Sequence, residues 1–268
     1  MIAEEPTPHR VTPVRQVRLF GFDFADLTTR VLLDLIGQSV KTRRRCWIAT
    51  INVQHLCLAE RNPSIRQTFS GADVRVADGM PIVWFSRFVR RALTERVTGS
   101  DLLLPLAEKA SAEGWRLFLC GGDPGVPERA AESLCARWPD LKVVGTASPF
   151  FADHETLVDP AANENLLAAI RNARPDVLLI AFGAPKQEQW IEQHLQSSGM
   201  NVPVAIGVGG TFDFLIGRQR RAPRWMRRAG LEWVFRMVTQ PLRLAPRYAR
   251  DTLTFSRLCA SELRGRRA

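Results

Sequence analysis

The sequence has only five cysteines, widely spaced, and no long apolar run, and each shortage excludes a class of protein. The cysteine count is odd and no Cys-x-x-Cys pair occurs, which argues against a disulfide framework and predicts reduced thiols. No apolar run approaches the roughly 18–20 residues that a membrane-spanning helix needs. The N-terminus is polar and proline-rich, without the pattern of a signal peptide. These features predict a cytoplasmic protein.

Motifs for metal binding and for serine hydrolases are also missing. The four histidines are scattered, with neither His-Glu-x-x-His nor a His/Cys spacing typical of zinc. No Asp-x-Asp occurs, the usual carboxylate pair for a divalent cation on a nucleotide-sugar diphosphate, and there is no Gly-x-Ser-x-Gly. We therefore expect no metal and no cofactor. In a sugar transferase, positive side chains would then stabilise the leaving diphosphate.

Positive charge is concentrated at the C-terminal end. The formal net charge is +10, and residues 216–268 contain 14 arginines, no lysine and three acidic residues, a net +11. The other 215 residues carry 23 basic and 24 acidic groups, a net −1. Arginine suits bidentate phosphate contacts better than lysine does. Apolar residues between these arginines predict short basic amphipathic helices, suited to a membrane surface or a lid over a site. The simpler alternative is a solvated face.

Strand-like and helix-like segments alternate along residues 14–215 at short intervals. Residues 14–20 predict a first strand, and residues 26–40 predict an amphipathic helix with Asp26 as its N-cap. This alternation predicts an α/β fold: a Rossmann-like, mainly parallel sheet with helices on both faces. We divide the chain into a flexible N-terminus (1–13), an α/β core (14–215) and a basic amphipathic C-terminal appendage (216–268).

Polar residues follow the predicted strands, and in a parallel sheet these strand ends meet at one edge. Asp78, followed by glycine, could face that cleft as a general base on a sugar hydroxyl, although Asp-Gly is also a common turn. The Gly-Gly-Asp-Pro-Gly segment at 121–125 could hold a phosphate on backbone N–H groups, although it matches no nucleotide fingerprint. The full set of candidates at this edge is Thr50, Asn52, Asp78, Gly121, Gly122, Gln187, Glu188 and Asp213.

Nine short blocks, in order over about residues 50–250, resemble the WecG/TagA/CpsF family of bacterial glycosyltransferases (glycosyltransferase family twenty-six). One block alone would be weak, but nine in family order are specific. They are Thr-Ile-Asn at 50–52, Ala-Asp-Gly-Met-Pro at 77–81, Arg-Val-Thr-Gly-Ser-Asp at 96–101, Gly-Gly-Asp-Pro-Gly at 121–125, Phe-Gly-Ala-Pro-Lys-Gln-Glu at 182–188, Gly-Gly-Thr-Phe-Asp-Phe at 209–214, Arg-Ala-Pro at 221–223, Leu-Glu-Trp at 231–233 and Gln-Pro-Leu-Arg at 240–243.

The resemblance implies an inverting, metal-independent transferase that moves a sugar from a UDP donor to a polyprenyl-diphosphate-linked saccharide, for cell-surface polysaccharide or exopolysaccharide. Donors in the family include N-acetylmannosamine, its uronic acid and glucose, and no residue here selects one. By this resemblance, Asp78 matches the family's proposed general base. Thr50 and Asn52 match its residues near the reacting sugar, and Gln187 matches a residue of its cleft. The resemblance further implies that the appendage closes over the site and touches the membrane, which places the protein at the inner face of the cell membrane.

The sequence leaves three questions open: which arginines bind the diphosphate, whether the protein self-associates, and which other class of protein it could be. For the diphosphate we choose Arg221 and Arg224, which lie nearest the core, with Arg218 and Arg228 as the next candidates. Self-association through the appendage is plausible. The alternatives are a Rossmann-like oxidoreductase, which lacks its glycine fingerprint, and a nucleic-acid-binding protein. We expect no nucleic-acid partner, because the charge is confined to the appendage while the body carries a cleft.

Overall fold

A six-stranded, all-parallel sheet forms the centre of the molecule, with the strand order β4-β3-β8-β7-β5-β6. The computed structural model describes residues 14–149, 160–197 and 200–265, so the predicted flexible N-terminus lies outside the described residues. The prediction of an α/β fold with a mainly parallel sheet is confirmed. The strands are β3 (Cys46–Ile51), β4 (Val74–Ala77), β5 (Arg116–Gly121), β6 (Lys142–Ala147), β7 (Val177–Ala181) and β8 (Val204–Gly207).

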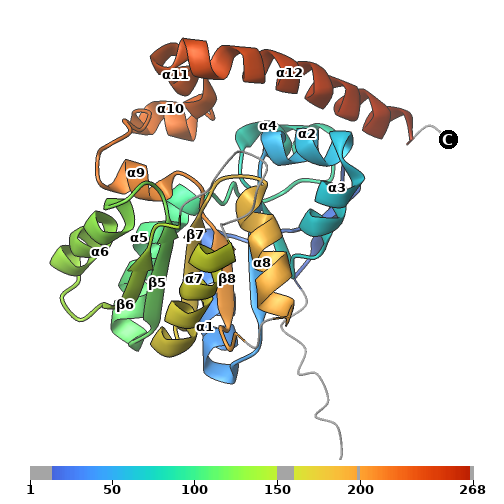
Figure 1. Cartoon of the computed structure of the whole chain (residues 1–268). Coiled ribbons are helices and arrows are strands. Elements are labelled where there is room, and N and C mark those ends of the chain that lie inside the picture. Colours follow the sequence, from blue (N-terminus) through green and yellow to red (C-terminus); the bar gives the residue numbers. More distant parts are fainter. Residues whose placement is uncertain (1–13, 150–159, 198–199, 266–268) are drawn as a thin grey trace, which may run out of the picture.

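Helices cover both faces of this sheet (Figure 1) because its strands are apolar on both sides. In β5, Leu117 and Leu119 belong to one apolar cluster, whereas Phe118 and Cys120 belong to the other. The first cluster includes residues of α1 (Thr29–Thr42), α5 (Gly99–Glu113) and α6 (Val126–Arg137). The second includes residues of α2 (Val53–Arg61), α3 (Pro63–Ser70), α4 (Met80–Phe88), α7 (Pro160–Ala173) and α8 (Lys186–Ser197).

The first predicted strand exists but lies outside the main sheet. It is β1 (Gln16–Leu19), which pairs antiparallel with β2 (Phe22–Ala25). Phe20 and Gly21 connect the two strands, both with positive φ, as a two-residue hairpin turn of type I′ requires. The predicted N-cap of the next helix was wrong by two residues. Thr28 caps α1 by accepting the Val31 N–H at 3.3 Å, while Asp26 accepts instead from the Thr94 N–H and from Arg15.

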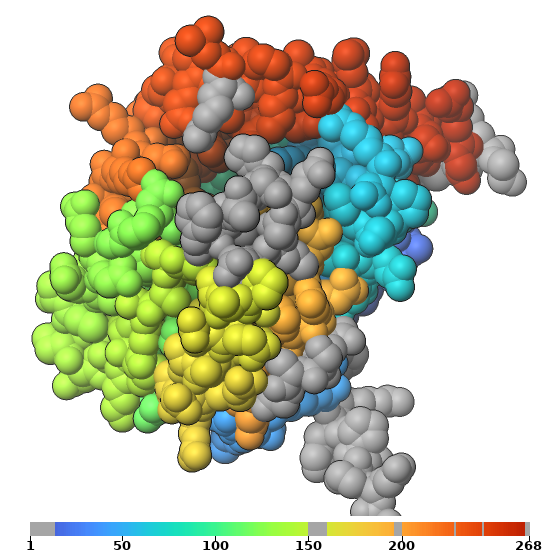
Figure 2. Space-filling model, in the orientation of Figure 1, coloured from blue at the N-terminus to red at the C-terminus, as the bar shows by residue number. Residues whose placement is uncertain are grey.

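The segment after β8 forms four helices that cross one end of the molecule (Figure 1). They are α9 (Thr211–Leu215), α10 (Arg224–Arg228), α11 (Glu232–Thr239) and α12 (Pro241–Arg264). The long helix α12 packs on α2, where Arg61 contacts Asp251 at 3.2 Å and the Cys57 thiol donates to the Asp251 carbonyl. Figure 2 shows this red segment running over the residues of the early helices. No helix of the described ranges is long and apolar enough to cross a membrane.

We predict that α12 is docked through a few buried leucines. Leu258 is 8% exposed and joins the apolar cluster beneath the helix, whereas Leu253 on the same helix is 64% exposed. Leu258→Ala should lower the free energy of unfolding by about 2–5 kcal/mol through a lost apolar contact and a cavity. Leu253→Ala is the matched control and should change it by less than about 0.5 kcal/mol. Equal effects in urea denaturation would contradict this docking.

Candidate active site

The carboxyl ends of β3 and β8 meet at one edge of the sheet, where Thr50 contacts Gly207, the last residue of β8. The Thr50 hydroxyl donates to the Gly207 carbonyl at 3.1 Å, which ties β3 to β8 at this edge. Asn52 is the N-cap of α2, and its Oδ1 accepts the His55 N–H at 3.2 Å. The cap satisfies a backbone donor of the first helical turn and fixes the side chain of Asn52. Thr50 is buried and Asn52 is half-buried.

Asp78 lies at the same edge, one residue after β4. Its backbone N–H donates to the Ile51 carbonyl at 2.8 Å, so it sits beside the end of β3. Gly79 follows with φ +152°, a conformation that residues with a side chain rarely adopt, and α4 begins directly afterwards. The chain turns sharply here and leaves Asp78 at the strand end. Among the described residues, none makes a hydrogen bond with the Asp78 carboxylate.

The surroundings of Asp78 favour a proton acceptor that works near neutral pH. Burial raises the pKa of this carboxyl to about 6; Arg96 and His55 oppose the rise, whereas Glu232 and Asp101 add to it. At neutral pH the group is therefore mostly ionised, yet it is more basic than an ordinary aspartate. A general base is most effective when its pKa lies close to the working pH.

The glycine-rich loop after β5 lies where two connections diverge. β5 and β7 are neighbours in the sheet, but the connection from β5 leads to β6 on one side and the connection from β7 leads to β8 on the other. Parallel sheets typically bind ligands between two strands whose connections run in opposite directions. Gly121 has φ +110°, and a Cβ there would lie 2.6 Å from the carbonyl carbon of Ala181, so only glycine fits. The Gly122 N–H donates to the Ala181 carbonyl at 3.2 Å. A phosphate contact from this loop would therefore use its other N–H groups.

Arg218 connects the segment after α9 to this loop. Its guanidinium forms an ion pair with Asp123 of the loop and lies 3.6 Å from Asp213 of α9. The two carboxylates raise the pKa of this already basic group, Asp123 more than Asp213. Two residues predicted to bind substrate, Arg218 and Asp213, are thus brought together at the outer side of the site.

The other predicted pair, Gln187 and Glu188, lies beneath the surface at the start of α8. Gln187 is 2% exposed, and its Oε1 accepts the N–H groups of Gly183 and Gly209 at 3.2 and 3.1 Å. Glu188 is fully buried, and its Oε1 accepts from Gln187 Nε2 at 2.7 Å. Gln187 therefore joins the loops after β7 and β8. Contact of either side chain with a substrate stays a prediction.

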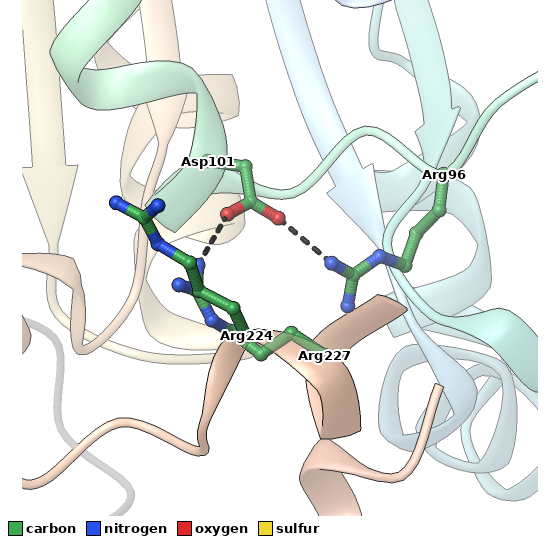
Figure 3. Close-up of a pocket in the computed structure, with 4 residues that line it drawn as sticks. All are labelled: Arg96, Asp101, Arg224 and Arg227. Atoms are coloured by element: carbon green, nitrogen blue, oxygen red, sulfur yellow. Dashed lines mark hydrogen bonds and ion pairs between the residues drawn. The ribbon is translucent and has the colours of Figure 1, made fainter. Parts of the chain in front are cut away.

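Asp101, in the first turn of α5, gathers arginines from two distant parts of the chain. Its Oδ2 accepts from Arg96 at 2.7 Å, and its Oδ1 accepts from Arg221 at 2.7 Å and from Arg227 at 3.3 Å. Figure 3 shows the carboxylate between Arg96 on one side and the arginines of α10 on the other. Burial by itself would raise the pKa of Asp101, but Arg221 and Arg96 hold it below its ordinary value.

The segment that carries Arg96 and Asp101 lies over the carboxyl edge of the sheet. The Val97 N–H donates to the carbonyl of Ala77, the last residue of β4, at 3.0 Å. A Cβ on Gly99 would lie 3.0 Å from the Cα of Val208, just after β8. The close approach of Gly99 to Val208 therefore sets Asp101 above the strand ends, on the side of the site where the appendage crosses.

A cavity of about 300 Å³ opens beside Asp101, and three of its four lining residues are arginines. We call it the arginine cavity; it is lined by Arg96, Asp101, Arg224 and Arg227. Glu232 of α11 also pairs with Arg96 at 3.5 Å and with Arg221 at 3.3 Å. Four arginines thus surround two carboxylates, which leaves two positive charges in excess. Such a site attracts an anion with two or more charges.

The arrangement includes residues that sequence reasoning did not assign to the site. Asp101, Arg96 and Arg227 were not predicted to bind a substrate, although Arg96 and Asp101 begin and end one of the quoted blocks. The only sequence signal for this ion pair was the opposite charge of Arg96 and Asp101, five positions apart in that block. Within the described ranges, no group of three His, Cys, Asp or Glu side chains is placed to hold one metal ion. The expectation of a metal-independent reaction stays a prediction.

The fold and the site together define a class. A parallel α/β sheet with a basic carboxylate and a cationic cavity at its carboxyl edge is typical of enzymes that act on phosphate-containing ligands. Comparison with protein-family models gives the family: residues 17–268 match the glycosyl transferase WecG/TagA/CpsF family. The match covers nearly the whole chain, appendage included, and the protein belongs to this family of glycosyltransferases.

We predict that Asp101 anchors the appendage at neutral pH. Asp101→Asn keeps the shape of the side chain but removes the charge that three arginines share. The free energy of unfolding should fall by about 1–3 kcal/mol. Asp140→Asn, at an exposed carboxylate in a turn, is the matched control and should change little.

The loss of unfolding free energy in Asp101→Asn should also depend on pH. Because the pKa of Asp101 is lower in the folded protein than in the unfolded chain, its stabilisation is present above the unfolded pKa and is lost as the pH falls through the folded pKa. The difference between wild type and Asp101→Asn in urea denaturation should therefore shrink in acid. A difference that stays constant from neutral pH into acid would contradict the role of this charge.

Proposed function

We propose that this glycosyltransferase moves a hexose or N-acetylhexosamine-type sugar from a UDP-sugar to a polyprenyl-diphosphate-linked saccharide, with inversion and without a metal ion. One observation carries the proposal. A carboxylate with a pKa of about 6, that of Asp78, shares the carboxyl edge of the sheet with the arginine cavity. A sugar transfer needs a base for the acceptor hydroxyl and positive charge for the leaving diphosphate, and these two features supply them.

The reaction would proceed as a single displacement. The acceptor hydroxyl oxygen attacks the anomeric carbon of the donor from the face opposite UDP, and Asp78 takes the hydroxyl proton. The bond between the anomeric carbon and the diphosphate oxygen breaks, and UDP leaves with the electron pair. Thr50 and Asn52, at the end of β3, would bind the sugar near the reacting carbon. The arginines would stabilise the negative charge that develops on the departing diphosphate.

Arg224 is the arginine best placed to bind the diphosphate directly. Arg96, Arg221 and Arg227 each pair with Asp101. Arg224 also lines the cavity, but within the described part of the chain it forms neither an ion pair nor a side-chain hydrogen bond. Its guanidinium therefore has all its donors available, and a bidentate contact with phosphate would displace no existing partner. The paired arginines would then serve mainly to hold Arg224 and the cavity in place.

The acceptor's lipid would be reached through the appendage. Apolar side chains project outward from it, with Trp225, Val238 and Leu242 respectively 65%, 71% and 95% exposed. They alternate with arginines along α10, α11 and α12. A surface with both features binds well to anionic lipid, because burial of apolar area adds to electrostatic attraction. We therefore place the enzyme at the inner face of the cell membrane, as a peripheral protein.

Asp78→Asn should lower the rate of sugar transfer by about 10²–10⁴-fold, the usual loss when a general base is removed. The amide has nearly the shape of the carboxylate, so binding of UDP, followed by calorimetry, should be unchanged. Asp140→Asn is again the control and should transfer at the wild-type rate. Transfer by Asp78→Asn within a few-fold of wild type would refute the assignment of the base.

Arg224→Ala should weaken UDP binding by about tenfold or more, because a charge-assisted contact to phosphate is worth about 1.5–3 kcal/mol. Arg257→Ala is the matched control, since Arg257 is an exposed arginine on α12, away from the cavity lining. It should leave the dissociation constant of UDP unchanged. Equal weakening in both variants would show that only the overall charge of the appendage matters.

A further inference from the structure

Helix α4, directly after the proposed base, has an outward side that carries two exposed aromatic side chains. Trp84 is 43% exposed and Phe88 is 72% exposed, and their spacing of four residues places them on one side of the helix. The other side, which includes Ile82 and Phe85, is buried in the body. Aromatic side chains gain much free energy when they are covered, so two of them left in water on one short helix indicate a partner.

These two side chains continue a set that is otherwise concentrated on the appendage. Nine exposed large apolar side chains occur among the described residues. Six of them lie on the appendage, two are Trp84 and Phe88, and the ninth is Val31 of α1. The body therefore adds exposed aromatic surface at one helix only, within the part of the chain that the structure describes.

Helix α4 lies against the appendage at both of its ends (Figure 1). At its start, a Cβ on Gly230, between α10 and α11, would lie 2.4 Å from the Cβ of Met80 and 2.8 Å from Cζ2 of Trp84. Beyond its end, Arg91 pairs with Glu262 of α12 at 3.2 Å. The exposed aromatic side chains of α4 therefore lie at the same end of the molecule as the appendage.

The charge around these aromatic side chains is positive. Residues 80–91 contain three arginines and no acidic residue. Arg87 and Arg90 are exposed, and Arg87 lies three residues after Trp84, on the same side of the helix. Such a surface fits anionic lipid, because electrostatic attraction adds to the burial of apolar area.

We infer that this outward side of α4 is a second membrane contact, which binds anionic lipid beside the appendage. It consists of Trp84, Arg87 and Phe88, with Arg90 at its end, and we call it the α4 face. A second copy of this chain is a poorer occupant. A two-fold symmetric contact places the same patch on both copies, so it would bring their arginines together without any acidic residue of α4 between them.

A membrane contact at α4 sets the position of the base relative to the lipid. The helix begins two residues after Asp78, and its nine residues span about 13 Å. A short rigid element thus joins Asp78 at one end to Phe88 at the other. The acceptor has a diphosphate and a saccharide between its lipid and the reacting hydroxyl, so its hydroxyl also lies a short distance above the membrane. This consequence rests on the proposed function, whereas lipid binding by α4 does not.

The experiment measures co-sedimentation of the full-length protein with vesicles of phosphatidylcholine, with and without phosphatidylglycerol. Phe88→Ala should lower the partition coefficient into the anionic vesicles about tenfold, because an apolar side chain that leaves water on binding is lost. Phe88→Trp keeps an aromatic side chain and should bind as the wild type does. Val31→Ala, at the exposed apolar residue of α1, is the control and should also bind as the wild type does.

The charge of the α4 face is tested separately. Arg87→Ala should lower partition into the anionic vesicles about fivefold, the usual contribution of one basic residue near such a surface. It should leave binding to vesicles of phosphatidylcholine alone unchanged. Wild-type binding to anionic vesicles by both Phe88→Ala and Arg87→Ala would overturn the inference. A changed oligomeric state of Phe88→Ala in sedimentation velocity, with vesicle binding intact, would also overturn it and place a second copy on this face.

Sugar transfer gives a readout that separates this inference from the proposed function. Phe88→Ala should lower transfer to a polyprenyl-diphosphate acceptor held in anionic vesicles, but leave transfer to a short-chain, water-soluble acceptor unchanged. Loss of vesicle binding in Phe88→Ala, in an enzyme whose wild type transfers no sugar to either acceptor, would support the α4 face and count against the proposed function.

Discussion

The contact between Asp101 and three arginines is the interaction on which the site depends. It joins the start of α5 to the segment before α5 and to the appendage, which are more than a hundred residues apart. Without it, Arg221 would keep only its pair with Glu232, which lies on the appendage itself, and Arg227 would keep no ion pair within the described ranges. Asp101 is thus the point where the appendage meets the body over the strand ends.

The same contact leaves the site positive. The two carboxylates neutralise two of four guanidinium groups and fix the positions of three, so the cavity is both ordered and attractive to an anion. Preorganised charge of this kind stabilises a transition state without having to rearrange when the reaction occurs. The cluster also acts on Asp78: Arg96 opposes the rise that burial causes in the pKa of this carboxyl, whereas Glu232 and Asp101 add to it.

The sequence predicts the layers of the fold because they follow from local pattern. The strands of the main sheet are apolar on both faces and end in glycine and polar residues, which is enough to predict a parallel sheet and its functional edge. Details that depend on tertiary contact were missed. Asp26 has the chemistry of an N-cap, but Thr94 and Arg15 bind it, and Thr28 caps α1 instead. Likewise, β1 was found as a strand, but nothing local shows that it pairs with β2 rather than with the sheet.

In the candidate site, too, the residues placed by local pattern were predicted and those placed by tertiary contact were missed. Asp78, Thr50 and Asn52 lie at the predicted edge because each follows or ends a strand. Glu188 was predicted as a substrate contact from its position after a strand, and only the tertiary packing of α8 on α3 and β8 shows that it is buried. Arg227 was missed because one arginine among fourteen in residues 216–268 carries no signal of its own. Its importance arises from Asp101, more than a hundred residues earlier.

The central claim is sugar transfer without a metal ion, and the most direct measurement is mass spectrometry of a polyprenyl-diphosphate-linked saccharide incubated with the enzyme, EDTA and each of a panel of UDP-sugars. Our account predicts one acceptor product, heavier by one sugar residue, from one donor or a small related group, with release of UDP. An enzyme that binds neither UDP nor the acceptor, and yields no product from any donor, would contradict it.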